Sequence, residues 1–117
     1  MRTSFQVKVP AFDGSFVCTV EKEEWKAFVE TLRHLETSVG RDAETSWGNM
    51  EENIELQFRL YKCGTLEGQY KFSPNNFSLG PTLSGAFEAD QTFLAGWVSS
   101  AQQVLDRFRQ QAREAQL

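Results

Sequence analysis

The sequence contains few of the residues from which metal, cofactor and catalytic sites are built. It has one histidine, His34, and two cysteines, Cys18 and Cys63, among 117 residues. These cannot assemble the usual four-ligand zinc set, and glycine-rich phosphate-binding motifs and a GxSxG serine motif are also missing. The cysteines form no CxxC motif and no disulfide framework, which fits a reducing compartment and leaves open a single bridge. We therefore expect no metal, no cofactor and no catalytic residues, and we expect that the protein is not an enzyme.

Long apolar runs are absent as well. No stretch approaches the roughly 20 apolar residues that a membrane-spanning helix needs, and the first residues lack the apolar core of a signal peptide. This predicts a cytoplasmic protein without a membrane partner. The net charge of −4 argues against nucleic acid, because binding a phosphate backbone requires clustered basic residues.

Hydrophobic residues, in contrast, are plentiful. They make up 40% of the chain and include ten phenylalanines, which is enough apolar material for one core. We therefore expect a single domain over residues 1–117.

The first half of the chain shows two strand patterns and one helix pattern. Residues 5–9 alternate between apolar and polar, residues 16–20 form a second apolar run, and Asp13-Gly14 between them favours a tight hairpin turn. Apolar residues then recur at helical spacing from residue 25 to residue 39. Gly40 follows as the expected stop of this helix, because glycine enters the left-handed backbone region without a Cβ clash.

The second half contains further strand patterns and a closing helix. A short strand is predicted near residues 44–47, and clearer ones at 54–60, 66–72 and 83–87, with Cys63-Gly64 at a turn. Asp90 is predicted to cap a long amphipathic helix over residues 93–112. The order β-β-α-(β)-β-β-β-α, with the short strand in brackets, predicts an α+β fold. In this fold an antiparallel sheet of five or six strands carries both helices on one face.

Isolated reactive residues have ordinary structural interpretations. His34 falls on the polar side of the first predicted helix, one turn after Glu30, so we expect both in water. Cys18 shares strand parity with Phe16 and Val20, which predicts a small buried hydrophobic residue.

Acidic residues concentrate between residues 42 and 55, around Trp47. Their spacing does not match a twelve-residue calcium loop. The segment is either a solvated loop or an electrostatic docking patch for a basic protein. Trp47, and Phe12 at the first hairpin's turn, are either interface anchors or plugs over the end of the sheet. The candidate partner-binding residues are Asp42, Glu44, Trp47, Glu51, Glu52 and Glu55.

Residues 83–97, a strand followed by Asp90-Gln91 and a hydrophobic helix start, carry a family resemblance. With Trp47 and the strands at 54–60 and 68–72, this pattern resembles the WapI-like family of small bacterial immunity proteins, mainly over residues 44–108. The resemblance implies a protein that binds and neutralises the C-terminal domain of a secreted or contact-dependent toxin. It assigns no toxin-contacting residue, because Asp90 is a helix cap and the apolar positions are core.

A second interpretation uses the face of the sheet that the helices leave uncovered. Its polar residues would form a shallow site for a small molecule or substrate, and the same face would suit a homo-oligomer contact. The residues of this face are Gln57, Arg59, Tyr61, Gln69 and Lys71.

Overall fold

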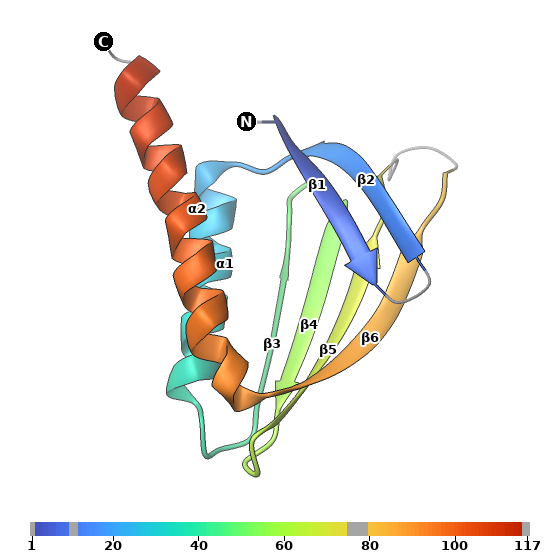
Figure 1. Ribbon diagram of the computed structural model, residues 1–117, viewed down its shortest axis with the longest axis vertical. Helices are drawn as coiled ribbons and strands as arrows, with labels where there is room; N and C mark the ends of the chain where they lie inside the picture. Colours follow the sequence, from blue (N-terminus) through green and yellow to red (C-terminus); the bar gives the residue numbers. More distant parts are fainter. Residues whose placement is uncertain (1, 10–11, 75–79, 116–117) are drawn as a thin grey trace.

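A computed structural model of the chain describes residues 2–9, 12–74 and 80–115, with side chains over 18–74 and 80–110. The described part contains six strands, two α-helices and one turn of 3-10 helix (Figure 1). The order agrees with the prediction, and the short strand expected near residues 44–47 is present as β3. In chain order the elements are β1 (Arg2–Val9), β2 (Phe12–Thr19), α1 (Lys22–Thr37), β3 (Ala43–Gly48), β4 (Ile54–Leu60), β5 (Thr65–Phe72), β6 (Leu83–Asp90), η1 (Gln91–Phe93) and α2 (Leu94–Ala115).

The strands form two sheets instead of the single sheet of five or six strands that was predicted. Strands β3, β4, β5 and β6 pair in that order in an antiparallel sheet, while β1 and β2 pair only with each other. The hairpin is joined to the rest through the end of β2, where Cys18 and Val20 are buried against Trp47 and Ile54. A strand pattern in the sequence does not reveal which sheet a hairpin enters, because that depends on such long-range contacts.

The connection of the first hairpin also differs from the prediction. Asp13 and Gly14 lie within β2, where they pair with Lys8 and Val7. The link between β1 and β2 therefore falls at residues 10–11, outside the described residues, and not at Asp13-Gly14.

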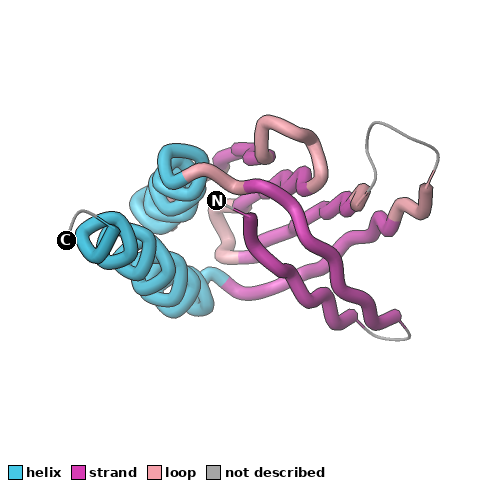
Figure 2. The backbone as a smooth tube through the Cα atoms, turned by 90° about the horizontal axis from the view of Figure 1, so that it is seen from above, coloured by secondary structure: helices cyan, strands magenta, loops and turns pink. Residues whose placement is uncertain are grey.

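Both helices pack on one face of the four-stranded sheet, as predicted. Figure 2 shows them gathered on one side of the strands. In β4 and β5, Phe58, Leu60 and Leu66 are buried on this inner face, and they pack against helix residues such as Leu35 and Leu105 in one cluster. The opposite, outer face carries the exposed positions that alternate with them. The sheet therefore has one face in the core and one face in solvent.

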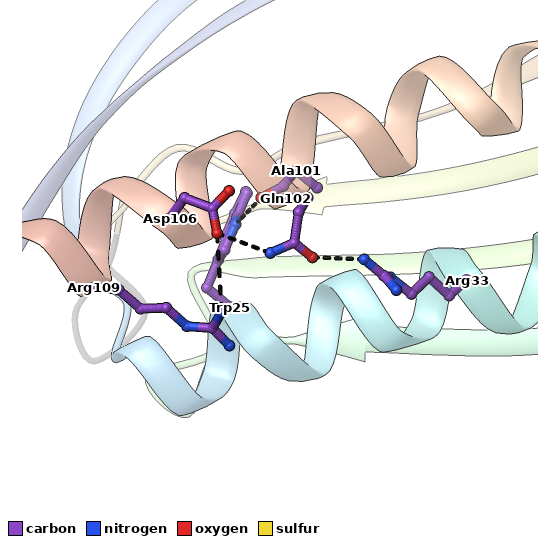
Figure 3. Close-up of polar contacts among 6 residues, drawn as sticks. All are labelled: Trp25, Arg33, Ala101, Gln102, Asp106 and Arg109. Carbon is purple, nitrogen blue, oxygen red and sulfur yellow. Dashed lines mark hydrogen bonds and ion pairs between the residues drawn. The ribbon is translucent and has the colours of Figure 1, made fainter.

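Side-chain hydrogen bonds fix the two helices against each other (Figure 3). The indole Nε1 of Trp25 in α1 donates to the carbonyl oxygen of Ala101 in α2 at 2.9 Å. Arg33 Nη2 donates to Gln102 Oε1 at 2.7 Å, and Gln102 Nε2 in turn donates to Asp106 Oδ1 at 3.0 Å. These contacts set the register of the helix pair and hold the start of α1 in place.

The predicted helix signals are confirmed, with two differences in burial. The left-handed backbone of Gly40 has φ of 92°, and the Asp90 carboxylate accepts the Thr92 N–H at 2.9 Å. That cap begins η1, which leads directly into α2. Val39 and Phe93, placed on apolar helix faces by the sequence, are exposed. Both lie at or beyond helix ends, where the helical period no longer sets the direction of the side chain.

Gly68 allows two aromatic rings to meet across the inner face of the sheet. It pairs with Phe58 on one side and Phe87 on the other, whose ring centroids are 6.4 Å apart. A Cβ at Gly68 would overlap the Phe87 ring. We expect Gly68→Ala to lower the free energy of unfolding by about 1–3 kcal/mol, the usual cost of overpacking.

Urea denaturation measures this effect, and Gly96→Ala is the matched control. A Cβ at Gly96 in α2 meets nothing within 4 Å, so this variant should gain up to about 1 kcal/mol from the better helix propensity of alanine. Equal stability of Gly68→Ala and wild type would contradict the steric account.

Candidate partner-binding surface

Trp47, a candidate interface anchor, lies in the core. Its side chain is 9% exposed, and its indole Nε1 donates to the carbonyl oxygen of Glu24 at 2.8 Å. Its ring lies 4.8 Å from Phe28 and 6.1 Å from Trp25, measured between centroids. Of the two interpretations of Trp47, an interface anchor or a plug over the end of the sheet, its burial favours the plug. The side chain supports the acidic segment from beneath and does not form part of its surface.

Two buried asparagines fix the loop between β3 and β4. The amide of Asn49 donates to the Thr19 carbonyl oxygen at 3.2 Å and accepts the Ile54 N–H at 2.9 Å. It also donates to Asn53 Oδ1 at 3.2 Å, and Asn53 Nδ2 donates to the Ser73 carbonyl oxygen at 2.9 Å. Strands β2, β4 and β5 are therefore tied together at this end of the molecule. This network was not predicted from the sequence. The signal for it was the presence of Asn49 and Asn53 on either side of residues 50–52.

The tip of the same loop is held from the side of α1. One carboxylate oxygen of Glu24 accepts the Met50 N–H at 2.7 Å, and the other accepts the Glu21 N–H at 3.2 Å. With both its base and its tip anchored, the loop exposes Met50, whose side chain is 84% accessible, beside the exposed Glu51 and Glu52. An apolar side chain next to two carboxylates is thus presented to solvent on a constrained backbone.

Two further acidic candidates, Glu44 and Glu55, lie on the outer face of the sheet, toward opposite ends. Glu44 is opposite Arg59 in the register, with 3.4 Å between Oε1 and Nε. Glu55 is opposite Lys71, with 3.9 Å between Oε2 and Nζ. Exposed ion pairs of this kind contribute little to stability, so they can exchange for contacts with a partner.

The register divides the six candidates between the two ends of β3 and β4. Glu55 lies opposite Gly48, beside the loop that carries Glu51 and Glu52, whereas Glu44 lies four residues farther along β3. Asp42 is at that far end, where its carboxylate accepts the Lys62 N–H at 2.9 Å. The structure therefore brings Glu51, Glu52 and Glu55 to one end and separates Asp42 and Glu44 from them.

An open hollow of about 500 Å³ lies between these two ends, over β3, β4 and β5. Arg59 on its wall stacks over the Tyr61 ring at 5.0 Å, and the Tyr61 hydroxyl donates to Glu67 at 3.0 Å. This hydrogen bond is the largest cause of a raised pKa of the Tyr61 phenol. The hollow is lined by three residues of the small-molecule interpretation, Gln57, Arg59 and Gln69, but not by Tyr61 or Lys71.

The cysteines and the histidine lie away from this hollow. Both thiols are free, and Cys18 is buried, which raises its pKa, as do the nearby Glu51 and Glu24 carboxylates to a smaller extent. Cys63 is exposed, and hydrogen bonds with the backbone and side chain of Thr65 lower its pKa. His34 is exposed on α1, as predicted.

Other site expectations concern the hairpin, metals and membranes. Phe12 is the first residue of β2 and pairs with Val9, but its side chain is outside the described residues. Over the described residues, no group of three or more His, Cys, Asp or Glu side chains is placed to hold a metal ion. None of the helices in that part of the chain is long and apolar enough to cross a bilayer.

These features define a small α+β protein with a helix-covered four-stranded sheet, an exposed polar face and a fixed acidic loop. The model of the immunity protein WapI-like family matches residues 1–109. The chain therefore belongs to this family, which confirms the resemblance and extends it to the N-terminal hairpin. Comparison with curated proteins and with solved structures gave no match.

Proposed function

We propose that this protein is a bacterial immunity protein that acts without catalysis. It binds the toxic C-terminal domain of a secreted or contact-dependent toxin and neutralises it in the cytoplasm of the producing cell. The observation that carries the proposal is the family match over residues 1–109, nearly the whole chain.

The contact surface that we propose starts at the loop tip formed by Met50, Glu51 and Glu52, with Glu55 beside it. Because Asn49 and Glu24 anchor this loop, little backbone entropy is lost when it binds. The exposed Met50 supplies an adaptable apolar contact. The carboxylates around it suit a basic protein surface, such as the substrate groove of a nuclease, and accelerate association.

Asp42 and Glu44 extend this surface across the outer face of the sheet. The ion pairs of Glu44 with Arg59 and of Glu55 with Lys71 are exposed. Basic side chains of a partner would replace Arg59 and Lys71 as the ion-pair partners of Glu44 and Glu55, and the loss of the two exposed pairs would cost little free energy. Trp47 contributes by positioning β3 and α1 beneath this surface, not by direct contact.

Charge reversal tests the acidic surface directly. Changing Glu51, Glu52 and Glu55 to lysine should slow association with the toxin domain about 10–100-fold at low salt, because the electrostatic attraction becomes repulsion. Stopped-flow or biolayer kinetics at several salt concentrations measure the rate, using a candidate toxin C-terminal domain chosen by genomic proximity to this gene.

The matched control reverses charge elsewhere. E23K/E30K/E36K, at exposed positions of α1, changes the net charge by the same amount as the triple variant and should bind nearly as fast as wild type. If the triple variant associates at the wild-type rate at low salt, the acidic surface is not the contact.

The alternative, a small-molecule module on the outer face, has less support. Its hollow is open, and the charged groups there interact with one another, as Arg59 does with Glu44 and Tyr61 does with Glu67. Small-molecule sites are usually concave pockets lined mainly by apolar side chains.

A further inference from the structure

Strand β6 is an edge of the four-stranded sheet, and the core is open beside it. In the described part of the chain, β6 pairs with β5 alone. Its inward residues Phe87 and Ala89 are only half-buried, whereas Gly68 and Leu66, their partners in β5, are buried. In Figure 1 the hairpin lies toward the upper end of the sheet, away from the lower end where β6 passes into α2. The Phe87–Asp90 half of β6 therefore presents an unprotected edge.

The outer side of this edge carries two carboxylates directly opposite each other. Glu67 in β5 and Glu88 in β6 are register partners, an arrangement of like charges that destabilises a sheet. Glu67 accepts the Tyr61 hydroxyl, and no ion pair reaches Glu88 from the side chains that the structure describes. A cationic group placed between the two carboxylates would remove the repulsion.

The inner side of the same edge carries exposed aromatic surface. Phe93 is 56% exposed, and its ring stacks on Trp97 with centroids 6.3 Å apart. Trp97 meets Phe87 edge to face at 6.0 Å. A Cβ at Gly96, which lies between Phe93 and Trp97 in the sequence, would meet nothing within 4 Å, so space beside them is open. A large aromatic side chain this exposed is typical of a binding surface.

We infer that the Phe87–Asp90 edge of β6 binds an extended segment of the toxin that carries alternating basic and apolar residues. The segment adds a strand to the sheet and pairs with the free backbone groups of β6. Because side chains alternate along a strand, its basic residues reach Glu67 and Glu88 while its apolar residues cover Phe93 and Trp97. This inference rests on the proposed function, since it takes the partner to be a protein toxin.

The charge of the edge favours a basic segment over a second copy of this chain. A second β6 would bring its own Glu88 and Asp90 toward carboxylates that already repel each other. Strand β6 also contains no lysine or proline, the residues that usually protect edge strands from pairing.

Two surface variants test the edge without threatening the fold. Glu88→Lys replaces the like-charge pair by an attractive one, so its thermal midpoint should equal or exceed that of wild type. Glu88→Lys and Phe93→Ser should each weaken the affinity for the toxin C-terminal domain by about tenfold or more. Glu30→Lys and Val39→Ser are the matched controls on exposed sites of α1 and its C-terminal turn, and they should bind as wild type does.

Amide hydrogen exchange of the complex locates the contact. Addition of the toxin segment should slow exchange at Phe87–Asp90 relative to the free protein. If the toxin domain binds but these amides stay unprotected and both edge variants bind normally, the edge inference is wrong and the proposed function stands.

If the toxin domain does not bind wild-type protein at all, the proposed function fails. The edge is then tested separately by NMR titration with a capped peptide of alternating lysine and valine, against a control peptide of alternating glutamate and valine. Shift changes at residues 87–93 with the lysine peptide alone support the edge as a site for basic extended segments, and their absence overturns it.

Discussion

Replacing Trp47 with alanine should lower the free energy of unfolding by about 3–5 kcal/mol, the range for removing a buried aromatic side chain. The indole fills the space between α1 and β3 and donates a hydrogen bond to the Glu24 carbonyl oxygen. The loss is a large part of the total stability of a domain of this size. Chemical denaturation followed by circular dichroism measures it.

Trp47→Phe separates packing from hydrogen bonding. It keeps a ring against Phe28 and loses the indole N–H, so the expected loss is about 1–3 kcal/mol. Suppose instead that Trp47→Ala keeps wild-type stability while losing toxin binding. The residue would then act as an interface anchor, and its placement in the core would be refuted.

Asn49→Ala should be the second most damaging substitution, lowering the free energy of unfolding by about 2–3 kcal/mol. The amide satisfies the Thr19 carbonyl oxygen and the Ile54 N–H and also bonds Asn53. Without it these buried groups lose their partner, and the loop over residues 50–52 loses its anchor. Denaturation measures the stability, and faster amide exchange at residues 50–52 should accompany the loss.

Gln69→Ala is the control, since it truncates an amide on the exposed face of β5. Surface changes of this kind usually alter stability by no more than about 0.5 kcal/mol. Should Asn49→Ala match Gln69→Ala in both stability and loop exchange, the asparagine network would not hold the loop.

Local patterns in the sequence predicted most elements of the fold. Strand β4 alternates without interruption, and Gly40, Gly64 and Asp90 occupy the turn and cap positions that backbone chemistry favours. The separate hairpin could not be predicted in this way. Its strands have the same kind of apolar pattern as the strands of the four-stranded sheet. Its position is set by the burial of Cys18 and Val20 against residues that are distant in the sequence.

The candidate surface was predictable in composition but not in arrangement. Charge alone identified Glu51, Glu52 and Glu55, and their exposure follows from the structure. Long-range hydrogen bonds determine the burial of Trp47, the Asn49 network and the Glu24 anchor. Each of these features includes a hydrogen bond between residues more than twenty positions apart in the sequence. Sequence periodicity carries no signal for such contacts. The edge of β6 likewise appears only when the strand order is known.

Growth rescue in a bacterium tests the central claim most directly. A candidate toxin C-terminal domain, chosen by genomic proximity to this gene, is expressed alone, with this protein, and with its triple Glu51, Glu52 and Glu55 lysine variant. The proposed function predicts that wild-type protein restores growth and co-purifies with the toxin domain, while the variant rescues less well. Soluble, folded wild-type protein that neither restores growth nor binds the toxin domain would contradict it.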